Sequence, residues 1–259
     1  MKLTIAYDGH DFHGWQRQHP PGKPPLRTVQ DTVQFAVQRT IRQPVSVVGA
    51  SRTDARVHAY GQVAAFSTIP PVSEEEPDEL RVPLDRLPQA VNRWLPDDVA
   101  ILDAAIVPDD FDPIKQAQSK TYQYTIHNCL TPPVFDRHRV LHFWQDLNVD
   151  HMAHAARYIV GTHDFASFAN THHGRDSTIR TVFACSVTRM TGQPERVIVE
   201  VSGSGFLYHM VRIISGTLVE VGRGRWEPEH VISILEARNR RAAGPTLAPE
   251  GLCLCRIEY

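Results

Sequence analysis

The segment GASRTDARVHAYGQVAAF (residues 49–66) combines a strand-forming pattern with an unusual polar loop. From Val57 to Phe66, small or apolar residues alternate with larger or polar ones, which is the two-residue period of a strand. A further strand is expected over residues 45–49, so the polar loop joins two strands that follow each other in the chain. The segment therefore predicts a strand-loop-strand unit with Asp54 at its tip.

The rest of the N-terminal half completes a β-α-β-β-α-β order. A strand is expected over residues 2–7, and Thr28 is expected to cap a helix that Pro44 ends. A short helix ending near Trp94 and a strand over residues 99–107 follow. This order of elements is that of a ferredoxin-like fold.

The C-terminal half repeats this order without obvious sequence similarity. Its patterns predict strands over residues 121–128, 181–188, 196–201 and 252–257, and helices over residues 152–160 and 213–221. Gly161 is expected to close the first of these helices, and Pro228 to open another at its first position. The sequence predicts an α+β fold of two ferredoxin-like β-α-β-β-α-β domains (residues 1–107 and 108–259), with antiparallel sheets joined around a central cleft that suits a ligand.

Composition excludes several classes of protein. The 259 residues are 42% hydrophobic and 22% charged, which excludes collagen, coiled coils and wholly disordered chains. No apolar run of about 18 residues is present, and Asp8 comes too early for a secretory signal, so we expect no membrane segment. The four cysteines show no metal spacing and no disulfide framework, which fits a protein of the reducing cytoplasm.

The formal net charge of −2 conceals an uneven distribution. Residues 74–112 carry twelve acidic and three basic side chains, a local charge of −9, which leaves +7 on the remainder. The acidic part includes a solvated insertion expected over residues 70–80. A neutral protein with such a distribution can present a basic face to nucleic acid, although scattered lysines and arginines are more often ordinary solvated surface.

Asp54 has Arg52 two residues before it and Arg56 two residues after it. A carboxylate beside guanidinium groups stays ionised at neutral pH, which suits a nucleophile or a charge stabiliser better than a general acid. Spacing alone leaves open a surface aspartate held in a turn by ordinary salt bridges.

The residues of this loop resemble the motif G-x-G-R-T-D-A-G-V-H-A of the tRNA pseudouridine synthase A family. The resemblance covers nearly the whole chain, and its other landmarks are AYDGHDFHGWQRQ (6–18), TVQ (28–30), PDDFD (108–112), KTYQYTIHN (120–128), GTHDFASF (161–168) and GFLYHMVRIISGTLVEVG (205–222). Three positions depart from the family pattern: Ser51 and Arg56 stand where glycine is common, and Ile114 stands where arginine is usual.

The resemblance implies a role for each of four residues. Asp54 matches the nucleophile that attacks the target uridine, whose base then detaches from the ribose, turns and rejoins it through C5. Tyr122 matches a tyrosine that stacks on that base, and Arg212 matches a basic residue that pairs with the catalytic carboxylate. Arg52 matches an arginine that holds the phosphate of the flipped nucleotide or fills the vacated position. No metal or organic cofactor is implied, because an isomerisation involves no redox change.

The resemblance also implies a substrate and partners. The implied substrate is the anticodon stem-loop of tRNA, at positions 38–40, and the implied assembly is a homodimer. Candidate phosphate contacts are Arg17, Arg27, Arg56, Lys120, Arg223 and Arg225. Tyr122 and Tyr124 share one face of their predicted strand, which leaves open that both are core aromatics. The rival functions are a pseudouridine synthase acting on other RNA sites, a non-catalytic RNA-binding protein and a histidine-based metal hydrolase.

Overall fold

The computed structural model describes residues 1–68, 82–170 and 176–259. The chain forms two compact units: unit 1 comprises Met1–Ala117 with Leu254–Tyr259, and unit 2 comprises Gln118–Cys253. The last residues of the chain, Leu254–Tyr259, belong to unit 1 although the residues before them belong to unit 2. The insertion expected over residues 70–80 lies outside the described residues.

Unit 1 is built on a sheet with the strand order β4-β1-β3-β10, in which β2 also pairs with β3. β1 runs antiparallel to both β3 and β4, and alternate β1 side chains (Leu3, Ile5, Tyr7) are buried. The strands are β1 (Lys2–Tyr7), β2 (Val48–Gly49), β3 (His58–Ala65), β4 (Val99–Ala105) and β10 (Leu252–Glu258).

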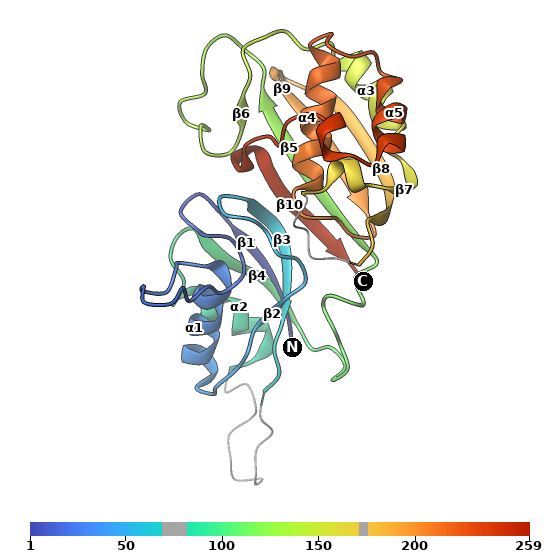
Figure 1. The fold of residues 1–259 in the computed structure, drawn as a ribbon. Helices are drawn as coiled ribbons and strands as arrows, with labels where there is room; N and C mark the ends of the chain where they lie inside the picture. Colours follow the sequence, from blue (N-terminus) through green and yellow to red (C-terminus); the bar gives the residue numbers. More distant parts are fainter. Residues whose placement is uncertain (69–81, 171–175) are drawn as a thin grey trace. The chain divides into compact units, whose positions relative to one another are not determined.

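Helix α1 (Val29–Ile41) begins and ends at clear signals in the sequence. The predicted cap Thr28 accepts a hydrogen bond from the Asp31 N–H (3.4 Å), and Arg42 ends the helix in the left-handed conformation (φ 56°). Helix α2 (Leu87–Asn92) follows a short 3-10 helix, η1 (Leu84–Arg86). Figure 1 shows α1 and α2 on the same face of the unit 1 sheet, where their apolar sides are buried.

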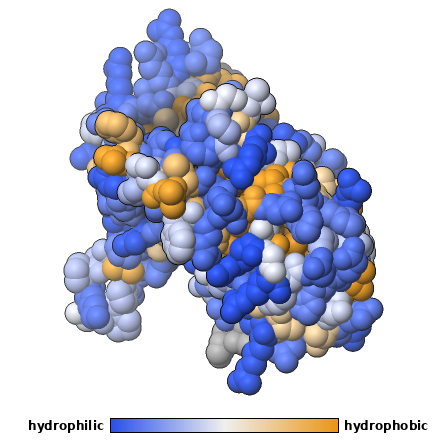
Figure 2. Space-filling model, turned by 90° about the horizontal axis from the view of Figure 1, so that it is seen from above, coloured by the Kyte–Doolittle hydropathy of each residue, from blue (hydrophilic) through white to orange (hydrophobic). Residues whose placement is uncertain are grey.

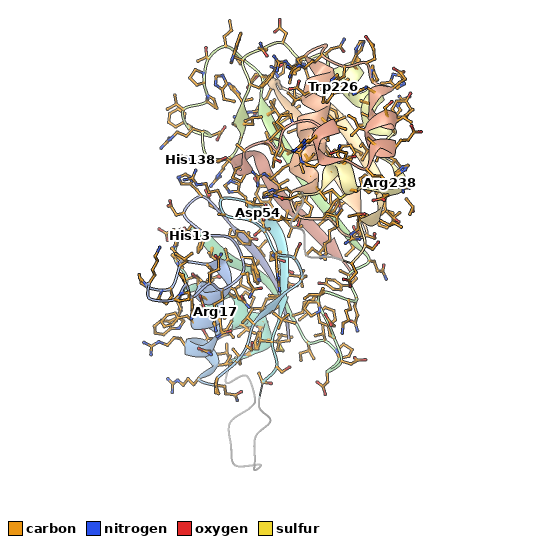
Figure 3. All side chains as sticks on the ribbon, in the orientation of Figure 1. His13, Arg17, Asp54, His138, Trp226 and Arg238 are labelled. Carbon is orange, nitrogen blue, oxygen red and sulfur yellow. The ribbon has the colours of Figure 1, made fainter. Side chains whose placement is uncertain are left out.

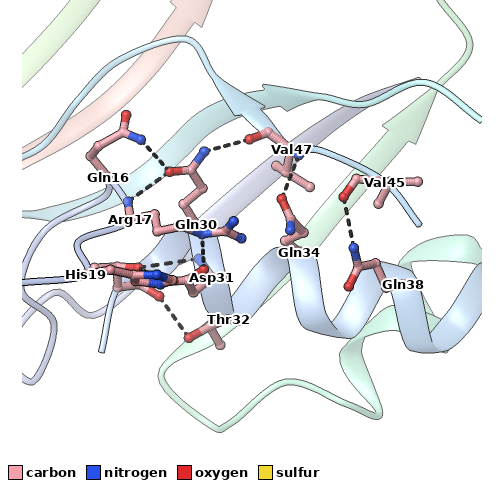
Figure 4. A network of polar contacts seen from close by, with 11 residues as sticks. Gln16, Arg17, His19, Gln30, Asp31, Thr32, Gln34, Gln38, Val45 and Val47 are labelled. Atoms are coloured by element: carbon pink, nitrogen blue, oxygen red, sulfur yellow. Dashed lines mark hydrogen bonds and ion pairs between the residues drawn. The ribbon is translucent and has the colours of Figure 1, made fainter. Parts of the chain in front are cut away.

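The strand expected over residues 45–49 is shorter than predicted. Only Val48–Gly49 pairs with β3. The preceding backbone binds glutamine side chains of α1 instead: the Val47 N–H donates to Gln34 (3.1 Å), and Gln38 donates to the Val45 carbonyl (3.0 Å) (Figure 4). These side chains satisfy polar groups that a strand ladder would otherwise pair.

Unit 2 contains the strands β5-β9-β8-β7, which pair in this order. Each of these neighbours is antiparallel, whereas the short β6 runs parallel to β5. The strands predicted over 181–188 and 196–201 are confirmed within longer elements, and the strand predicted over 121–128 is confirmed as far as residue 127. The strands are β5 (Ser119–His127), β6 (Leu141–His142), β7 (Gly161–Asp164), β8 (Ile179–Met190) and β9 (Gln193–Gly203).

The helices of unit 2 lie on one face of its sheet (Figure 1). They are α3 (Val149–Arg157), α4 (Met210–Gly222) and α5 (His230–Ala237), with the 3-10 helices η2 (Ala166–Phe168), η3 (Arg240–Ala242) and η4 (Pro249–Gly251). Two predicted helix ends are wrong. Gly161 does not close α3 but begins β7 with a positive φ of 121°, and Pro228 precedes the cap Glu229 of α5.

The fold class is therefore α+β with mostly antiparallel pairing. Helix α4 is buried on nearly every side, which fits its largely apolar sequence. Elsewhere, Figure 2 shows hydrophilic residues over most of the displayed face, with apolar residues in smaller areas. In the described part of the chain, no helix combines the length and the apolar character needed to cross a membrane.

Candidate catalytic site

Asp54 lies in the loop between β2 and β3, and its side chain is half-buried (Figure 3). Hydrogen bonds fix the backbone on both sides of it. The Thr53 carbonyl accepts from the Trp15 N–H (3.0 Å), and the Arg56 N–H donates to the Phe12 carbonyl (3.2 Å). The Asp54 carbonyl itself accepts from the Val57 N–H (3.2 Å), which closes a turn. The carboxylate is therefore presented from a well-anchored loop.

Two glycines of the AYDGHDFHGWQRQ segment allow this anchoring. Gly14 has a φ of 90°, and a Cβ there would lie 2.7 Å from the Thr53 carbonyl oxygen. A Cβ on Gly9 would lie 2.0 Å from the Val57 carbonyl oxygen. Any larger residue would push these backbones apart. The sequence identifies this segment as a landmark but does not indicate what its glycines do. The positive φ of Gly14 and the close approach of both glycines to the Asp54 loop show their role.

Side chains beneath the loop add further contacts. The Tyr7 hydroxyl lies 2.7 Å from Thr53 Oγ1, and Gln62, which is fully buried, donates to the Ser51 carbonyl (2.7 Å). Gln62 Oε1 also accepts from the Ser51 N–H (3.3 Å). Gln62 thus binds only the backbone of Ser51 in these two hydrogen bonds. Ser51 does not have a positive φ, so this position does not require glycine.

His58 fixes the end of the loop at the start of β3. Its ring is buried, and Nδ1 lies 3.1 Å from the Gly9 nitrogen and 3.1 Å from Asp8 Oδ1. His58 thus joins the first residues of β3 to the end of β1. Sequence analysis treated it as an alternating strand residue and missed this positioning role.

Arg52 and Arg56 are both exposed beside Asp54. Within residues 1–68, 82–170 and 176–259, no hydrogen bond or ion pair engages the Arg52 guanidinium. Arg56 adopts φ 67°, the left-handed conformation that favours glycine. The loop therefore keeps the backbone shape that a family glycine would give, while it carries an extra positive charge.

The left-handed geometry of Arg56 leads to a prediction about stability. We expect Arg56→Gly to be more stable than Arg56→Val by about 1–2 kcal/mol, because a β-branched residue is strained at positive φ. Both variants lack the guanidinium, so their difference in free energy of unfolding isolates the backbone. Urea denaturation measures it, and equal stabilities would contradict the observed φ.

Two other arginines proposed as phosphate contacts are paired with acids of unit 1. Arg17 forms an ion pair with Asp31 of α1 (Figure 4). Arg27 makes two hydrogen bonds of 2.8 Å to Asp98, and its guanidinium lies 3.9 Å from the Phe12 ring centroid. The hydrogen bonds to Asp98 raise the pKa of Arg27. Both guanidinium groups therefore have an acidic partner within unit 1.

Gln30, the last residue of the TVQ landmark, organises the same region. Its Oε1 accepts from Gln16 Nε2 (2.8 Å) and from the Arg17 N–H (2.9 Å), while its Nε2 donates to the Val47 carbonyl (2.8 Å) (Figure 4). One half-buried glutamine thus joins α1 to the segment that precedes β2 and to the segment that follows Trp15.

The PDDFD landmark forms a tight turn at the end of unit 1. Asp112 Oδ1 accepts from the Ile114 N–H (2.9 Å) and the Lys115 N–H (3.1 Å), and these hydrogen bonds lower the pKa of Asp112. Ile114, which replaces the usual arginine, is 51% exposed. This position therefore presents an apolar surface where a positive charge was expected.

In unit 2, Tyr122 and Tyr124 occupy β5 but differ in their surroundings. Tyr122 is 7% exposed, and its ring packs edge-on against Phe206 with the centroids 5.3 Å apart. Tyr124 is fully buried, and its hydroxyl donates to the Ala248 carbonyl (2.7 Å). Burial raises the pKa of Tyr124 far above its ordinary value. Both tyrosines are thus buried, and Tyr122 differs from Tyr124 in retaining a small exposed fraction.

Arg212 lies in the first turn of α4 and is half-buried. Its Nε donates to the Leu247 carbonyl (2.7 Å), which fixes the guanidinium near η4. At the other end of α4, Arg223 and Arg225 both contact Glu220, at 3.4 and 2.9 Å. Glu220 is 6% exposed, so these arginines neutralise a buried carboxylate. Lys120 is half-buried at the start of β5.

The units divide the predicted residues into two groups. Unit 1 brings Arg52, Asp54 and Arg56 together on one loop, and unit 2 contains Tyr122 and Arg212. Pairing of Arg212 with Asp54 therefore stays a prediction. In the described residues, no group of three or more histidine, cysteine or acidic side chains is placed to hold a metal ion, and His172 and His173 lie outside those residues.

Comparison with known proteins adds independent information. A family model described as tRNA pseudouridine synthase matches residues 3–114 and 155–259. Proteins named tRNA pseudouridine synthase A from Moorella thermoacetica, Bacillus subtilis and Acetivibrio thermocellus are 44%, 41% and 40% identical to this chain. Each comparison covers 100% of this chain and 99%, 98% and 99% of the respective relative. The chain therefore belongs to the tRNA pseudouridine synthase family of isomerases.

Proposed function

We propose that this protein converts uridine to pseudouridine in the anticodon stem-loop of tRNA, with Asp54 as the nucleophile. The observation that carries the proposal is the anchored loop that presents a half-buried carboxylate between Arg52 and Arg56, in a chain of this family. The test is incubation of the protein with a tRNA transcript, followed by mapping of modified positions. Pseudouridine elsewhere in the RNA would overturn the anticodon assignment, and its complete absence would overturn the enzymatic one.

The chemistry that we propose begins with a flipped nucleotide. A base inside a stem is out of reach, and extruding it costs a few kcal/mol. Asp54 then forms a bond to the uridine, and the bond between N1 and the ribose breaks. The base turns and C5 joins the ribose, and the bond to Asp54 breaks, which restores the free carboxylate. The proton on C5 must leave and N1 must gain one, so the reaction needs no oxidant, and we propose no metal or organic cofactor.

Tyr122 is proposed to stack on the target base and to assist removal of the C5 proton. Stacking of a base on an aromatic ring contributes about 1–3 kcal/mol, which offsets part of the free energy needed to flip the base. Contact with Phe206 supports this role, because it holds the Tyr122 ring at a defined angle of 86° to its neighbour. A ring held in this way loses little entropy when a base packs on it.

The two functions of Tyr122 can be separated by substitution. We expect Tyr122→Phe to bind tRNA normally but to turn over about a hundredfold more slowly, since acid–base assistance contributes factors of that order. Tyr122→Ala should lose both affinity and rate. Tyr124→Phe is the matched control: it loses the hydrogen bond to Ala248 and about 1 kcal/mol of stability, but keeps its turnover number. Equal turnover by all these proteins would remove Tyr122 from the site.

The remaining charged residues are proposed to act on the RNA backbone and on Asp54. Arg212 is proposed to pair with the Asp54 carboxylate, and Arg52 to hold the phosphate of the flipped nucleotide. The proposed phosphate contacts are Arg17, Arg56, Lys120 and Arg223. The Arg52 guanidinium is exposed and has no polar partner within the described ranges, which leaves it available for a phosphate.

We also propose the wider arrangement in which this chemistry takes place. Residues 1–107 and 108–259 would form two ferredoxin-like domains, the first carrying Asp54 and the second completing the RNA-binding surface. A second copy of the chain would complete a homodimer, which sedimentation at working concentration tests. The enzyme would act in the cytoplasm, where its tRNA substrate is processed.

A further inference from the structure

Unit 2 contains a cavity of about 670 Å³ whose lining is rich in arginine. Two segments form it: η2 with the residues that follow it, and the segment that follows α5. The second segment contributes Arg238, Asn239, Arg240 and Arg241, and the first contributes Asn170. None of the described residues that line this arginine cavity is acidic or aromatic. Figure 3 labels Arg238 at the end of α5.

A buried serine fixes the shape of the arginine cavity. Ser167 is fully buried, and its hydroxyl donates to the Ile234 carbonyl of α5 (2.6 Å) while accepting from the Asn239 N–H (2.8 Å). Asn239 Oδ1 in turn accepts from the Arg241 N–H (3.0 Å). The backbone that carries the arginines is therefore held in place before any ligand binds, and Ser167 belongs to the GTHDFASF landmark, to which sequence analysis gave no role.

The three arginines differ in how their charge is balanced. Arg238 is 70% exposed, and its Nε lies 3.3 Å from Asp164 Oδ2. Arg240 donates to Thr246 Oγ1 (3.0 Å) and to the Ala243 carbonyl (3.4 Å), both of which are neutral. Arg241 is exposed, and neither Arg240 nor Arg241 forms an ion pair with any residue the structure describes. The cavity therefore carries a net positive charge.

Partial burial adds a reason for an anion to bind there. Desolvation lowers the pKa of Arg240, which means that its surroundings disfavour the charged guanidinium. An anion beside it would offset that cost, and guanidinium groups match the geometry of phosphate oxygens well. Among the residues that the structure describes, no aromatic ring lines the cavity for a base to stack on, so the sugar–phosphate backbone is the better match.

We propose that the arginine cavity binds a backbone phosphate of the tRNA substrate, through lining residues other than those assigned to the reaction. This proposal rests on the proposed function. The volume of the arginine cavity lies within the range of about 300–1,000 Å³ that is typical of ligand pockets. Such a volume accommodates a phosphate with its sugar. Contacts of this kind position an RNA without reading its sequence.

The test compares tRNA binding by the full-length wild-type protein, Arg241→Ala and Arg241→Lys over a series of KCl concentrations. We expect Arg241→Ala to raise the Kd about threefold or more and to reduce the slope of log Kobs against log salt by about 0.9, because one fewer counterion is released. Arg241→Lys should restore most of the slope, since it keeps the charge. Arg157→Ala is the control: Arg157 is an exposed arginine of α3 that does not line the cavity.

The outcomes separate this proposal from the proposed function. If Arg241→Ala matches Arg157→Ala in Kd and slope while the wild-type protein produces pseudouridine, the cavity is not an RNA site. If Arg241→Ala weakens binding of inorganic phosphate but leaves tRNA binding intact, the cavity takes a free anion and the RNA assignment is wrong. A wild-type protein that makes no pseudouridine would overturn the proposed function, whatever the binding data show.

Discussion

Replacing Asp54 with Asn should reduce pseudouridine formation by a factor of about a thousand or more, because a carboxamide cannot act as the nucleophile. Binding of tRNA should persist, since the substitution removes one negative charge and keeps the size of the side chain. The loop should also keep its shape, because hydrogen bonds of the backbone groups of Thr53, Arg56 and Val57 hold it. Single-turnover assays and binding titrations measure the two effects separately.

Asp103→Asn provides the matched control for this experiment. Asp103 is an exposed aspartate of β4 in the same unit, and no hydrogen bond or ion pair joins its side chain to the described residues. The Asp103→Asn variant should keep the turnover number and the stability of the wild-type protein. If Asp54→Asn were as active as Asp103→Asn, the nucleophile of the enzyme would have to lie elsewhere.

Gly14→Ala should impair both folding and catalysis. At φ 90° an alanine is strained, and its Cβ would lie 2.7 Å from the Thr53 carbonyl oxygen, so the two segments must separate. We expect a loss of about 1–3 kcal/mol in the free energy of unfolding. A displacement of the Asp54 loop by about 1 Å would lower turnover roughly a hundredfold. Denaturant titration and single-turnover assays on the same preparation measure these effects.

Gly22→Ala separates backbone strain from the contact with the Asp54 loop. Gly22 has a similar positive φ of 71°, but a Cβ there would meet nothing within 4 Å. It should therefore show a modest loss of stability and a normal turnover number. Equal turnover by Gly14→Ala and Gly22→Ala would mean that close packing against Thr53 does not position the catalytic loop.

Local signals predicted the helices of the first half well. Thr28 caps α1 as expected, because an N-cap acts on the residues next to it and needs no distant partner. By contrast, residues 45–47 read as a strand, but Gln34 and Gln38 bind their backbone instead. Hydrogen bonds between a helix side chain and a distant backbone leave no periodic pattern in the sequence.

Long-range pairing explains the other differences. The final strand was predicted over residues 252–257, and β10 confirms it, but Leu254–Tyr259 belongs to unit 1. A strand's own residues do not specify its neighbour. Arg17 and Arg27 likewise read as free surface charges, because Asp31 and Asp98, which bind them, can be identified as partners only in three dimensions.

The identities of the residues, rather than their spacing, pointed to the candidate site. Asp54 between two arginines is equally typical of a surface turn, and the family motif is what assigned it to chemistry. The structure contributes what no motif describes: the close approach of Gly9 and Gly14, the buried Gln62 beneath the loop, and the left-handed backbone of Arg56.

The glutamines of α1 have a consequence for behaviour at high concentration. An edge segment with open N–H and C=O groups can recruit a strand from another molecule and so begin aggregation. Here both polar backbone groups of Val47 are occupied, by Gln34 and Gln30, and the Val45 carbonyl is occupied by Gln38. These side chains shield the border next to β2 from intermolecular β-pairing.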